Sequence, residues 1–347
     1  MTQVTLAVDA MGGDRGLAVT VPAVARILER HRQLRVVLTG DQAALEQALR
    51  GQGLDDEERV CIEHASQLVE MDDPVSVALR SRRDSSMRVA LNLVREGRAD
   101  AAVSAGNTGA LMAVSRFVLK TLPGVDRPAI CTAIPARNGH FHMLDLGANV
   151  DSGAAHLLQF ALMGAAVVRA VDGVEMPAVA LLNIGEEEIK GSEVVREAAT
   201  LLSGHPAIDF RGYVEGTDIF AGKVDVVVCD GFVGNVALKS MEGTASMIGT
   251  MIREEIDRSW LRKLSGLFAL PLLRALRARM DPDHYNGASL VGLNGIVVKS
   301  HGGAGVEGFR AALDVAVLEA ERRVPALIGD ALHSGGPAAV EAAPDSV

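Results

Sequence analysis

Two patterns of hydrophobic and polar residues alternate along the chain and predict an α/β protein. Short apolar runs end in small, acidic or amide residues, and most are followed by segments whose apolar residues recur every three or four positions. The first pattern is typical of buried strands and the second of amphipathic helices. The N-terminal part gives strands over 4–11, 34–39 and 60–63 and a helix over 17–30. This series predicts a largely parallel sheet.

The remaining elements follow from the same two patterns. Further strands are predicted over 100–104, 128–135, 140–146, 178–184, 208–213, 224–228 and 296–299, with 128–135 and 140–146 forming a hairpin. Further helices are predicted over 86–96, from 108, over 152–170, 235–265 and 272–280, and up to about 323. Residues 286–295 are predicted to be a glycine-containing loop. We expect one domain over 1–332, a helical hairpin over about 235–282, and a disordered tail over 333–347.

The stretch 100–112 resembles an anion-binding loop. Its strand stops at Ser104, two glycines let the backbone bend, and Asn107 and Thr108 can cap the helix that follows. The free N–H groups and positive dipole end of that helix would then face a ligand above the loop. An ordinary strand-to-helix connection has the same composition, so the two interpretations are about equally favoured.

Polar residues of similar kinds follow nearly every predicted strand. Because ligands bind at the carboxyl ends of strands in open α/β sheets, we expect these residues to converge on one edge of the sheet. The candidates are Asp9, Gly12, Gly13, Asp14, Ser104, Asn107, Thr108, Asp145, Asn149, Asn183, Glu186, Lys190, Asp230, Asn235, Lys239, Lys299 and His301. A lone histidine such as His301 is often structural, and Cys229 follows four apolar residues, as a core residue would.

Composition excludes several functions. The net charge of −10 and the aromatic content of 3% argue against binding of nucleic acid. The three cysteines are far apart, as is typical of a reducing cytoplasm, and no His/Cys cluster has metal-ligand spacing. The sequence contains no Walker A loop, dinucleotide fingerprint or G-x-S-x-G elbow. We therefore expect a cytoplasmic protein that at most lies on a membrane surface.

Seven motifs follow one another between residue 4 and about residue 320. They are Asp9-Ala-Met-Gly-Gly-Asp14, Arg82-Arg-Asp-Ser-Ser-Met87, Ser104-Ala-Gly-Asn-Thr-Gly-Ala110, Leu144-Asp-Leu-Gly-Ala-Asn149, Asn183-Ile-Gly-Glu186 with Lys190-Gly191, Asp230-Gly-Phe-Val-Gly-Asn235 with Lys239, and Lys299-Ser-His-Gly302. Together they resemble the bacterial phosphate acyltransferase family of phospholipid synthesis. The resemblance implies transfer of a fatty acyl group from acyl carrier protein to inorganic phosphate, giving acyl phosphate.

The same resemblance implies a three-layer α/β/α fold related to phosphotransacetylases and to isocitrate and isopropylmalate dehydrogenases, working as a homodimer. No cofactor is expected, and no metal ligand is assigned. Our hypothesis is that one group of residues holds phosphate and another orients or polarises the thioester carbonyl. The first group is Ser104, Asn107, Thr108 and Lys190; the second is Lys239, Asn235 and His301, with Asn183 counted as catalytic. The remaining candidates are assigned to phosphate and substrate binding.

Two other interpretations stay open. One is a phosphotransacetylase-like enzyme, or one using nucleotide or acyl-CoA, with the same fold. The other is a non-catalytic scaffold at the membrane, although a scaffold would not require so many polar strand-end loops.

Residues 258–280 predict contact with a membrane surface. The stretch has six basic residues and no acidic one, and it combines the only tryptophan with a short apolar tip. The predicted contacts are Trp260, Leu267, Phe268 and Leu270; burial in a dimer interface is the alternative. Such contact would deliver acyl phosphate to a membrane glycerol-3-phosphate acyltransferase. For the acidic carrier protein, the candidate docking patches are Arg80, Arg82 and Arg83, or the arginines near Arg262.

Overall fold

The computed structural model describes residues 3–260, 262, 269, 271 and 285–334. The first part of the chain forms β1 (Thr5–Asp9), α1 (Leu17–Arg30), β2 (Arg35–Gly40), α2 (Gln42–Gln52), β3 (Val60–His64), α3 (Val75–Arg80), α4 (Ser86–Arg95), β4 (Ala101–Ser104) and α5 (Thr108–Leu119). The second part forms β5 (Ala129–Ala136), β6 (Gly139–Leu144), α6 (Ala154–Val171), β7 (Ala178–Asn183), α7 (Glu193–Leu202), β8 (Asp209–Glu215), a 3₁₀ turn (Ile219–Ala221), β9 (Val226–Val228) and α8 (Gly231–Asp257). The chain then returns to the first part with β10 (Ala288–Val291), β11 (Ile296–Lys299), α10 (Val306–Arg322) and α11 (Val324–Ser334).

The strands form one sheet in the order β3-β2-β1-β4-β11-β10-β5-β6-β9-β7-β8. Neighbours are parallel except at three places, β11 with β10, β10 with β5, and β5 with β6. Three successive reversals leave β6, β9, β7 and β8 running opposite to β3, β2, β1, β4 and β11. The prediction that all strand-end loops converge on one edge is therefore wrong, because the carboxyl ends of the two halves face opposite edges of the sheet.

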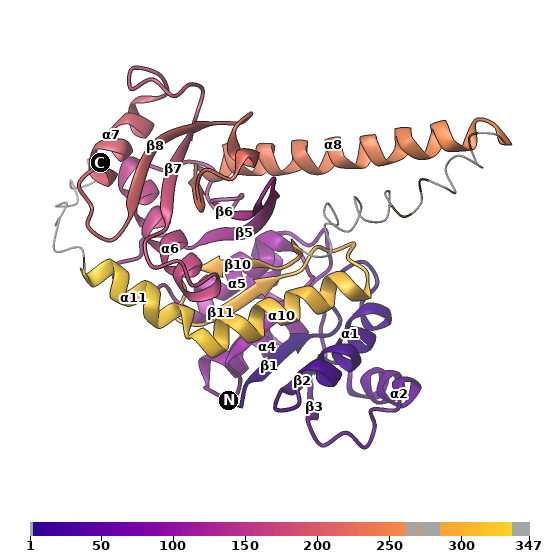
Figure 1. Cartoon of the computed structure of the whole chain (residues 1–347). Coiled ribbons are helices and arrows are strands. Elements are labelled where there is room, and N and C mark those ends of the chain that lie inside the picture. The colour runs from indigo at the N-terminus through magenta and orange to yellow at the C-terminus, as the bar shows by residue number, and fades with distance from the viewer. Residues whose placement is uncertain (1–2, 261, 263–268, 270, 272–284, 335–347) are drawn as a thin grey trace.

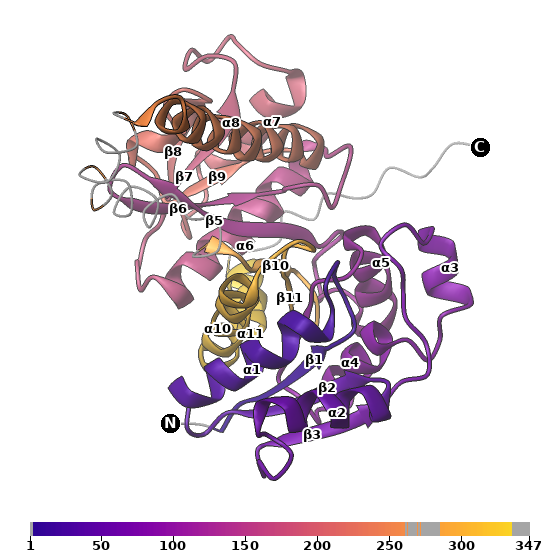
Figure 2. The ribbon, with the colours of Figure 1, turned by 90° about the vertical axis from the view of Figure 1, so that its right-hand side faces the viewer.

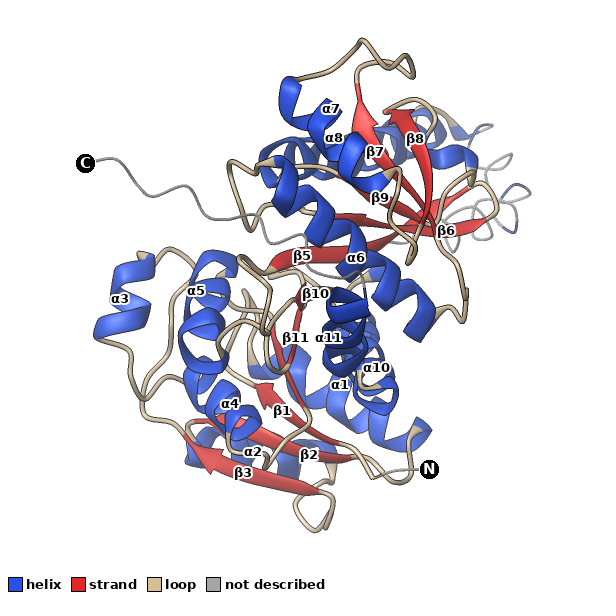
Figure 3. Cartoon of the chain, turned by 90° about the vertical axis from the view of Figure 1, so that its left-hand side faces the viewer, coloured by secondary structure: helices blue, strands red, loops and turns tan. Residues whose placement is uncertain are grey.

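Helices cover both faces of each half (Figures 2 and 3). In the N-terminal half, α4 and α5 lie on one face, and α1 and α10 lie on the other, with α10 packed against β11 and β4. In the C-terminal half, α6 packs against β9 and β6 on one face, together with α7 and α11, and α8 begins against β6. The three-layer α/β/α fold predicted from the sequence is confirmed.

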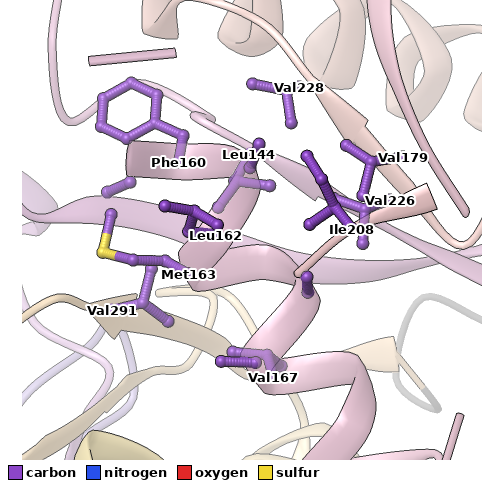
Figure 4. Packing of buried hydrophobic residues seen from close by; sticks show 14 of the residues in the cluster. Leu144, Phe160, Leu162, Met163, Val167, Val179, Ile208, Val226, Val228 and Val291 are labelled. Atoms are coloured by element: carbon purple, nitrogen blue, oxygen red, sulfur yellow. The ribbon is translucent and has the colours of Figure 1, made fainter. Parts of the chain in front are cut away.

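Helix α6 is the centre of the C-terminal core. Phe160, Met163 and Val167 pack with Leu144 and Val226 from the sheet (Figure 4). Among the described residues, α6 is long and apolar enough by composition to cross a membrane, but 61% of that stretch is buried inside the fold. Its apolar sequence is therefore explained by burial between the sheet and α11.

Several expectations about elements need correction. Residues 288–291, predicted to lie in a loop, form β10, whose four residues are too few for a periodic pattern and which exists by pairing with β11 and β5. Helix α11 follows α10 directly and was not predicted. Helix α8 begins at Gly231 rather than 235 and ends at Asp257, and it projects away from the two halves (Figure 1). The predicted tail over 333–347 begins too early, because residues 333 and 334 belong to α11; its remainder from 335, and most of the second arm of the predicted hairpin, lie outside the described residues.

Candidate functional site

Three polar side chains stand in a row across the N-terminal half of the sheet. The strand register pairs Asp9 with Ser104 and Ser104 with Lys299, at the carboxyl ends of β1, β4 and β11. All three residues are buried. We call Asp9, Ser104 and Lys299 the N-terminal row.

Hydrogen bonds connect two members of this row to the loop that follows β4. The Ser104 hydroxyl donates to Asp9 Oδ2 over 2.6 Å and accepts from the N–H of Gly106 over 3.0 Å. Glycine is required at position 12, because a Cβ there would lie 2.6 Å from Asp9 Oδ2. Asp9 Oδ1 is buried and has no hydrogen-bond partner among the described residues, and burial raises the pKa of Asp9. The row is therefore a polar centre with unused hydrogen-bonding capacity.

Lys299 is an unusually buried lysine. Its Nζ donates to the backbone carbonyls of Ala105 and Ser300. The pKa of Lys299 is lowered to about 8, chiefly by burial and in smaller part by the charge of Lys239, while Asp9 and Asp14 oppose the shift. The structure thus brings Lys239, from α8, within electrostatic range of the row.

The loop after β11 holds His301 in a defined orientation. Its backbone N–H donates to Asn286 Oδ1 over 3.0 Å, and its Nδ1 accepts from the N–H of Gly303 over 3.2 Å. A neutral imidazole that accepts at Nδ1 carries its proton on Nε2, so Nε2 is a hydrogen-bond donor in an exposed side chain. The N–H of Asp14 donates to the carbonyl of Gly302 and fastens this loop to the loop after β1.

A groove of about 860 Å³ runs along α5. One wall is α5 from Thr108 to Lys120, and the rest comes partly from the loop after β6, including Gly147, and from Asn235 at the start of α8. Asn107 caps α5 by accepting from the N–H of Ala110 over 3.0 Å. Among the described residues no carbonyl accepts from the N–H groups of Thr108 and Gly109. The positive end of α5 therefore faces the groove with free donors.

The polar side chains after β6 and β9 are satisfied within the protein. Asp145 is fully buried and accepts from the N–H groups of Ile130, Ala148 and Asn149 and from the Asn149 amide, over 2.8–3.1 Å. Asp230 caps α8 by accepting from the N–H groups at the first turn. We call Asp145, Asn149 and Asp230 the C-terminal row.

Two glycines let the loops of the C-terminal row pack against each other. A Cβ at Gly231 would lie 2.2 Å from the carbonyl oxygen of Asn149, and one at Gly234 would lie 1.9 Å from that of Asp145. Cys229 is buried beside them, and burial raises the pKa of its thiol, as expected of a core cysteine. This row therefore builds the loop that presents Gly147 and Asn235 to the groove.

Three other predicted residues, Asn183, Glu186 and Lys190, lie at the end of β7 and in the loop that follows it. The amide of Asn183 donates to the carbonyls of Gly185 and Lys190, and Lys190 pairs with Glu187 over 2.8 Å. Glu186 is exposed. None of the described residues of this loop lines the groove, so the structure does not bring Asn183, Glu186 and Lys190 to it.

Sequence reasoning missed a basic and aromatic cluster around the end of α5, to which Arg88 of α4 and Lys120, the C-cap of α5, belong. Arg88 and Lys120 lie over the Phe117 ring, with Arg88 Cζ 5.1 Å and Lys120 Nζ 4.9 Å from its centroid. Arg116, Phe117 and Lys120 line the groove. A signal was present, because Thr108, Met112, Arg116 and Lys120 recur at four-residue spacing and so share one helix face.

Comparisons with known proteins agree with this fold and identify the family. A family model described as fatty acid synthesis protein matches residues 4–327. The chain is 69% identical over 336 residues to a phosphate acyltransferase of Alcanivorax borkumensis, covering 97% of this chain and 99% of that protein. It is 55% identical over 331 residues to one of Alkalilimnicola ehrlichii, covering 95% and 96%. A phosphotransacetylase from Streptococcus pyogenes has a similar structure, with a TM-score of 0.64 at 19% identity over 92% of this chain and 94% of that one. The predicted relation of the fold to phosphotransacetylases is confirmed.

Proposed function

Because this chain belongs to the fatty acid synthesis protein family and is, like its relatives, a phosphate acyltransferase, we propose that it moves a fatty acyl group from acyl carrier protein to inorganic phosphate. A phosphate oxygen attacks the thioester carbonyl, the carbon–sulfur bond breaks, and the thiolate leaves and takes up a proton. The products are acyl phosphate, a precursor for phospholipid synthesis, and free carrier protein. The observation that carries the proposal is the groove, which begins at the free N–H groups of α5.

The contacts refine the roles of the predicted residues. The N–H groups of Thr108 and Gly109 and the Thr108 hydroxyl are available to hold phosphate. The Ser104 side chain is hydrogen-bonded to Asp9 and Gly106, and the Asn107 side chain is hydrogen-bonded to Ala110 and to the loop before α3. These two residues therefore position the phosphate site. This arrangement suits a reaction in which phosphate is the nucleophile and the protein only needs to orient two anions and stabilise an oxyanion.

The thioester carbonyl is proposed to meet donors from helix α8 and from the loop after β11. Asn235 lines the groove, Lys239 follows it by one helical turn on α8, and His301 offers an Nε2–H donor. Lys239 is paired with Glu242 over 2.7 Å, and it would leave this partner for the developing oxyanion. Lys299 would supply a positive charge beneath the phosphate.

The decisive experiment incubates the purified chain with acylated carrier protein and phosphate and measures acyl phosphate and free carrier. Thr108→Val should lower phosphate-dependent release by about tenfold or more and raise the KM for phosphate, because it removes a donor at the α5 terminus. The matched control is Thr200→Val, on the exposed surface of α7 far along the chain. Release that requires acyl-CoA and nucleotide instead of phosphate would support the alternative enzyme, and no turnover of any thioester would support a scaffold.

The carrier protein is proposed to dock beside the α5 cluster of Arg88, Arg116, Phe117 and Lys120. The predicted alternative patches are partly neutralised, since Arg82 pairs with Asp73 and Arg262 with Glu255. An acidic carrier would meet basic charge at the mouth of the groove that receives its thioester. The double change Arg116→Glu/Lys120→Glu should raise the KM for acylated carrier severalfold, with weakened salt dependence. The same effect from Arg80→Glu/Arg83→Glu alone would place docking at the alternative patch.

Helix α8 supports the proposed homodimer. Met247, Ile248, Met251 and Ile252 form one apolar stripe, and Met247 and Met251 are 55% and 56% exposed. An exposed apolar stripe on a projecting helix is typical of an interface (Figure 1). Met247→Glu/Met251→Glu should convert a dimer to monomers in analytical ultracentrifugation. A wild-type monomer, or a variant that stays dimeric, contradicts pairing through this stripe.

Membrane contact is proposed just beyond that stripe, at the cytoplasmic face of the membrane. Trp260 is 72% exposed, whereas Leu267, Phe268 and Leu270 lie outside the described residues. Trp260→Ala should reduce co-sedimentation with anionic vesicles at low salt, and Trp260 fluorescence should shift on binding. Met251→Glu is the matched control, because it changes the dimer stripe alone. Equal vesicle binding by Trp260→Ala and wild type would place the contact elsewhere. Contact of this kind would bring acyl phosphate to a membrane glycerol-3-phosphate acyltransferase.

A further inference from the structure

Two histidines and an aspartate meet at the end of β6 remote from the C-terminal row. His140 Nε2 lies 3.0 Å from Asp172 Oδ1, and His142 Nε2 lies 2.9 Å from Asp172 Oδ2. The three potential ligand atoms all lie within 4.8 Å of one another. Neither histidine nor Asp172 lines the groove or touches the N-terminal row in the described structure.

Rigid elements hold all three residues in place. His140 and His142 are two apart on β6 and therefore point to the same face of the sheet. Strand β6 is paired on both sides at His142, which lies opposite Ala133 of β5 and Val226 of β9. Asp172 is the C-cap of the eighteen-residue helix α6, so it stands at a fixed helix end. The two imidazole rings lie edge to face with their centroids 5.3 Å apart. Both rings direct Nε2 at the carboxylate of Asp172.

The electrostatics of the cluster favour a cation. The C-terminal end of α6 has negative dipole character, and Asp172 adds a carboxylate there. The other charged group that acts on His140 is Asp225, which is also acidic. His142 is nearly buried, whereas His140 and Asp172 are partly exposed, so an ion could enter from solvent and keep water as a further ligand.

We propose that His140, His142 and Asp172 bind a transition-metal ion of the Zn²⁺ class through the two Nε2 atoms and one carboxylate oxygen. Two imidazole nitrogens and one carboxylate oxygen form a borderline donor set, which suits Zn²⁺ and not Mg²⁺ or Ca²⁺. Because the site is at the far end of β6, its role is to tie the β5–β6 hairpin to the end of α6. The proposal is independent of the proposed acyl transfer.

The test uses the untagged full chain after removal of metal with a chelator. Titration calorimetry with ZnCl₂ should show one equivalent bound per chain, MgCl₂ should show none, and Zn²⁺ should raise the melting temperature reversibly. His142→Gln and Asp172→Asn should each weaken Zn²⁺ binding by about a hundredfold or more, since the loss of partners outside the ligand set already costs about 10–100-fold. Co²⁺ should give the visible absorption of a bound ion in wild type only.

Two control variants test whether Zn²⁺ binds at sites other than the cluster. His31→Gln removes a His–Asp pair of the same kind, His31 Nε2 to Asp314 Oδ1 over 2.9 Å, which has a single histidine. Cys61→Ser removes an exposed thiol, which is another group able to bind Zn²⁺. Both should bind Zn²⁺ like wild type. If Asp172→Asn lowers the melting temperature without metal, His140→Gln, at the exposed edge of the cluster, takes its place. Wild type that binds no Zn²⁺, or binding that survives every cluster variant, would overturn the proposal.

Discussion

The N-terminal and C-terminal rows both consist of polar residues at strand ends, but they differ in how far their polar atoms are satisfied by hydrogen bonds within the protein. In the C-terminal row, Asp145 accepts four hydrogen bonds and Asp230 caps α8, so the acids complete the backbone. In the N-terminal row, Asp9 Oδ1 has no partner among the described residues, and Lys299 is buried with a pKa of about 8. An acid or amide at a strand end therefore indicates a ligand site only where its hydrogen-bonding capacity is left over.

The difference follows from where each row stands in the fold. The three antiparallel pairings between β11 and β6 place the rows at opposite edges of the sheet. No member of either row lines the groove along α5 itself. Its lining includes Thr108, which follows the strand of Ser104, and Gly147 and Ala148, which follow Asp145. The N-terminal row would supply charge to the substrate, whereas the C-terminal row holds the loop that lines the groove.

Removal of Asp145 should have the largest effect on stability. Asp145→Ala leaves the buried N–H of Ile130, the partly buried N–H groups of Ala148 and Asn149, and the Asn149 amide without this acceptor, which should lower the free energy of unfolding by about 4 kcal/mol. Asp9→Ala loses one hydroxyl contact and should cost about 1 kcal/mol. Urea unfolding of both variants compares the rows directly, and equal losses would show that the rows do not differ.

Removal of the Lys299 charge should affect activity and spare stability. Lys299→Met should lower kcat/KM by about 10²–10³, the loss typical of one preorganised donor. Its unfolding free energy at pH 7 should be equal to or above that of wild type, because a buried charge is removed. Since Lys299 is charged only below a pKa of about 8, wild-type kcat/KM should fall as pH rises through 8, and Lys299→Arg should lose this limb.

Exposed Lys223 offers the control for that comparison, as Lys223→Met should change neither quantity. A Lys299→Met enzyme with wild-type kcat/KM would leave the N-terminal row without a part in the reaction.

Glu319 is a buried acidic residue of the N-terminal half to which no part in the reaction is assigned, so it shows what burial alone does. This acid of α10 is buried against Ser289 of β10, and burial raises its pKa to about 7 from 4.5. The folded state then binds the proton more tightly than the unfolded state, so stability falls as pH rises from 4.5 through 7. Glu319→Gln keeps an acceptor for Ser289 and removes this slope, which should stabilise the protein at pH 8 by up to about 3 kcal/mol.

The same variant should leave kcat/KM unchanged, because the side chain of Glu319 is buried against Ser289 and touches none of the residues proposed to hold phosphate or the thioester. Equal pH dependence of unfolding in Glu319→Gln and wild type would show that Glu319 is not the group responsible.

Local pattern predicted much of the fold, because most elements are long enough to carry a period. Helix α1 matches its predicted bounds, and Asn107 caps the helix it was expected to cap. The reversal of strand direction was not predictable, since it depends on β10. This strand has only four residues, lies between two glycines, and is a strand because it pairs with β11 and β5. The same motifs also could not show which acids are satisfied, because Asp145 and Asp9 differ in contacts made over long range.

The smallest predicted effect concerns the coupling within the N-terminal row. Asp9 raises the pKa of Lys299 against the effect of burial, and Asp14 does so less. Asp9→Asn keeps an acceptor for the Ser104 hydroxyl but removes the charge, so the falling limb of kcat/KM should move to lower pH by roughly one unit or less. Asp14→Asn should move it less, in the same direction. A pH profile of kcat/KM for wild type and both variants tests this order. A limb that moves to higher pH, or that moves further in Asp14→Asn, would mean that a group other than Lys299 titrates there, and the N-terminal row would then resemble the C-terminal row in being structural.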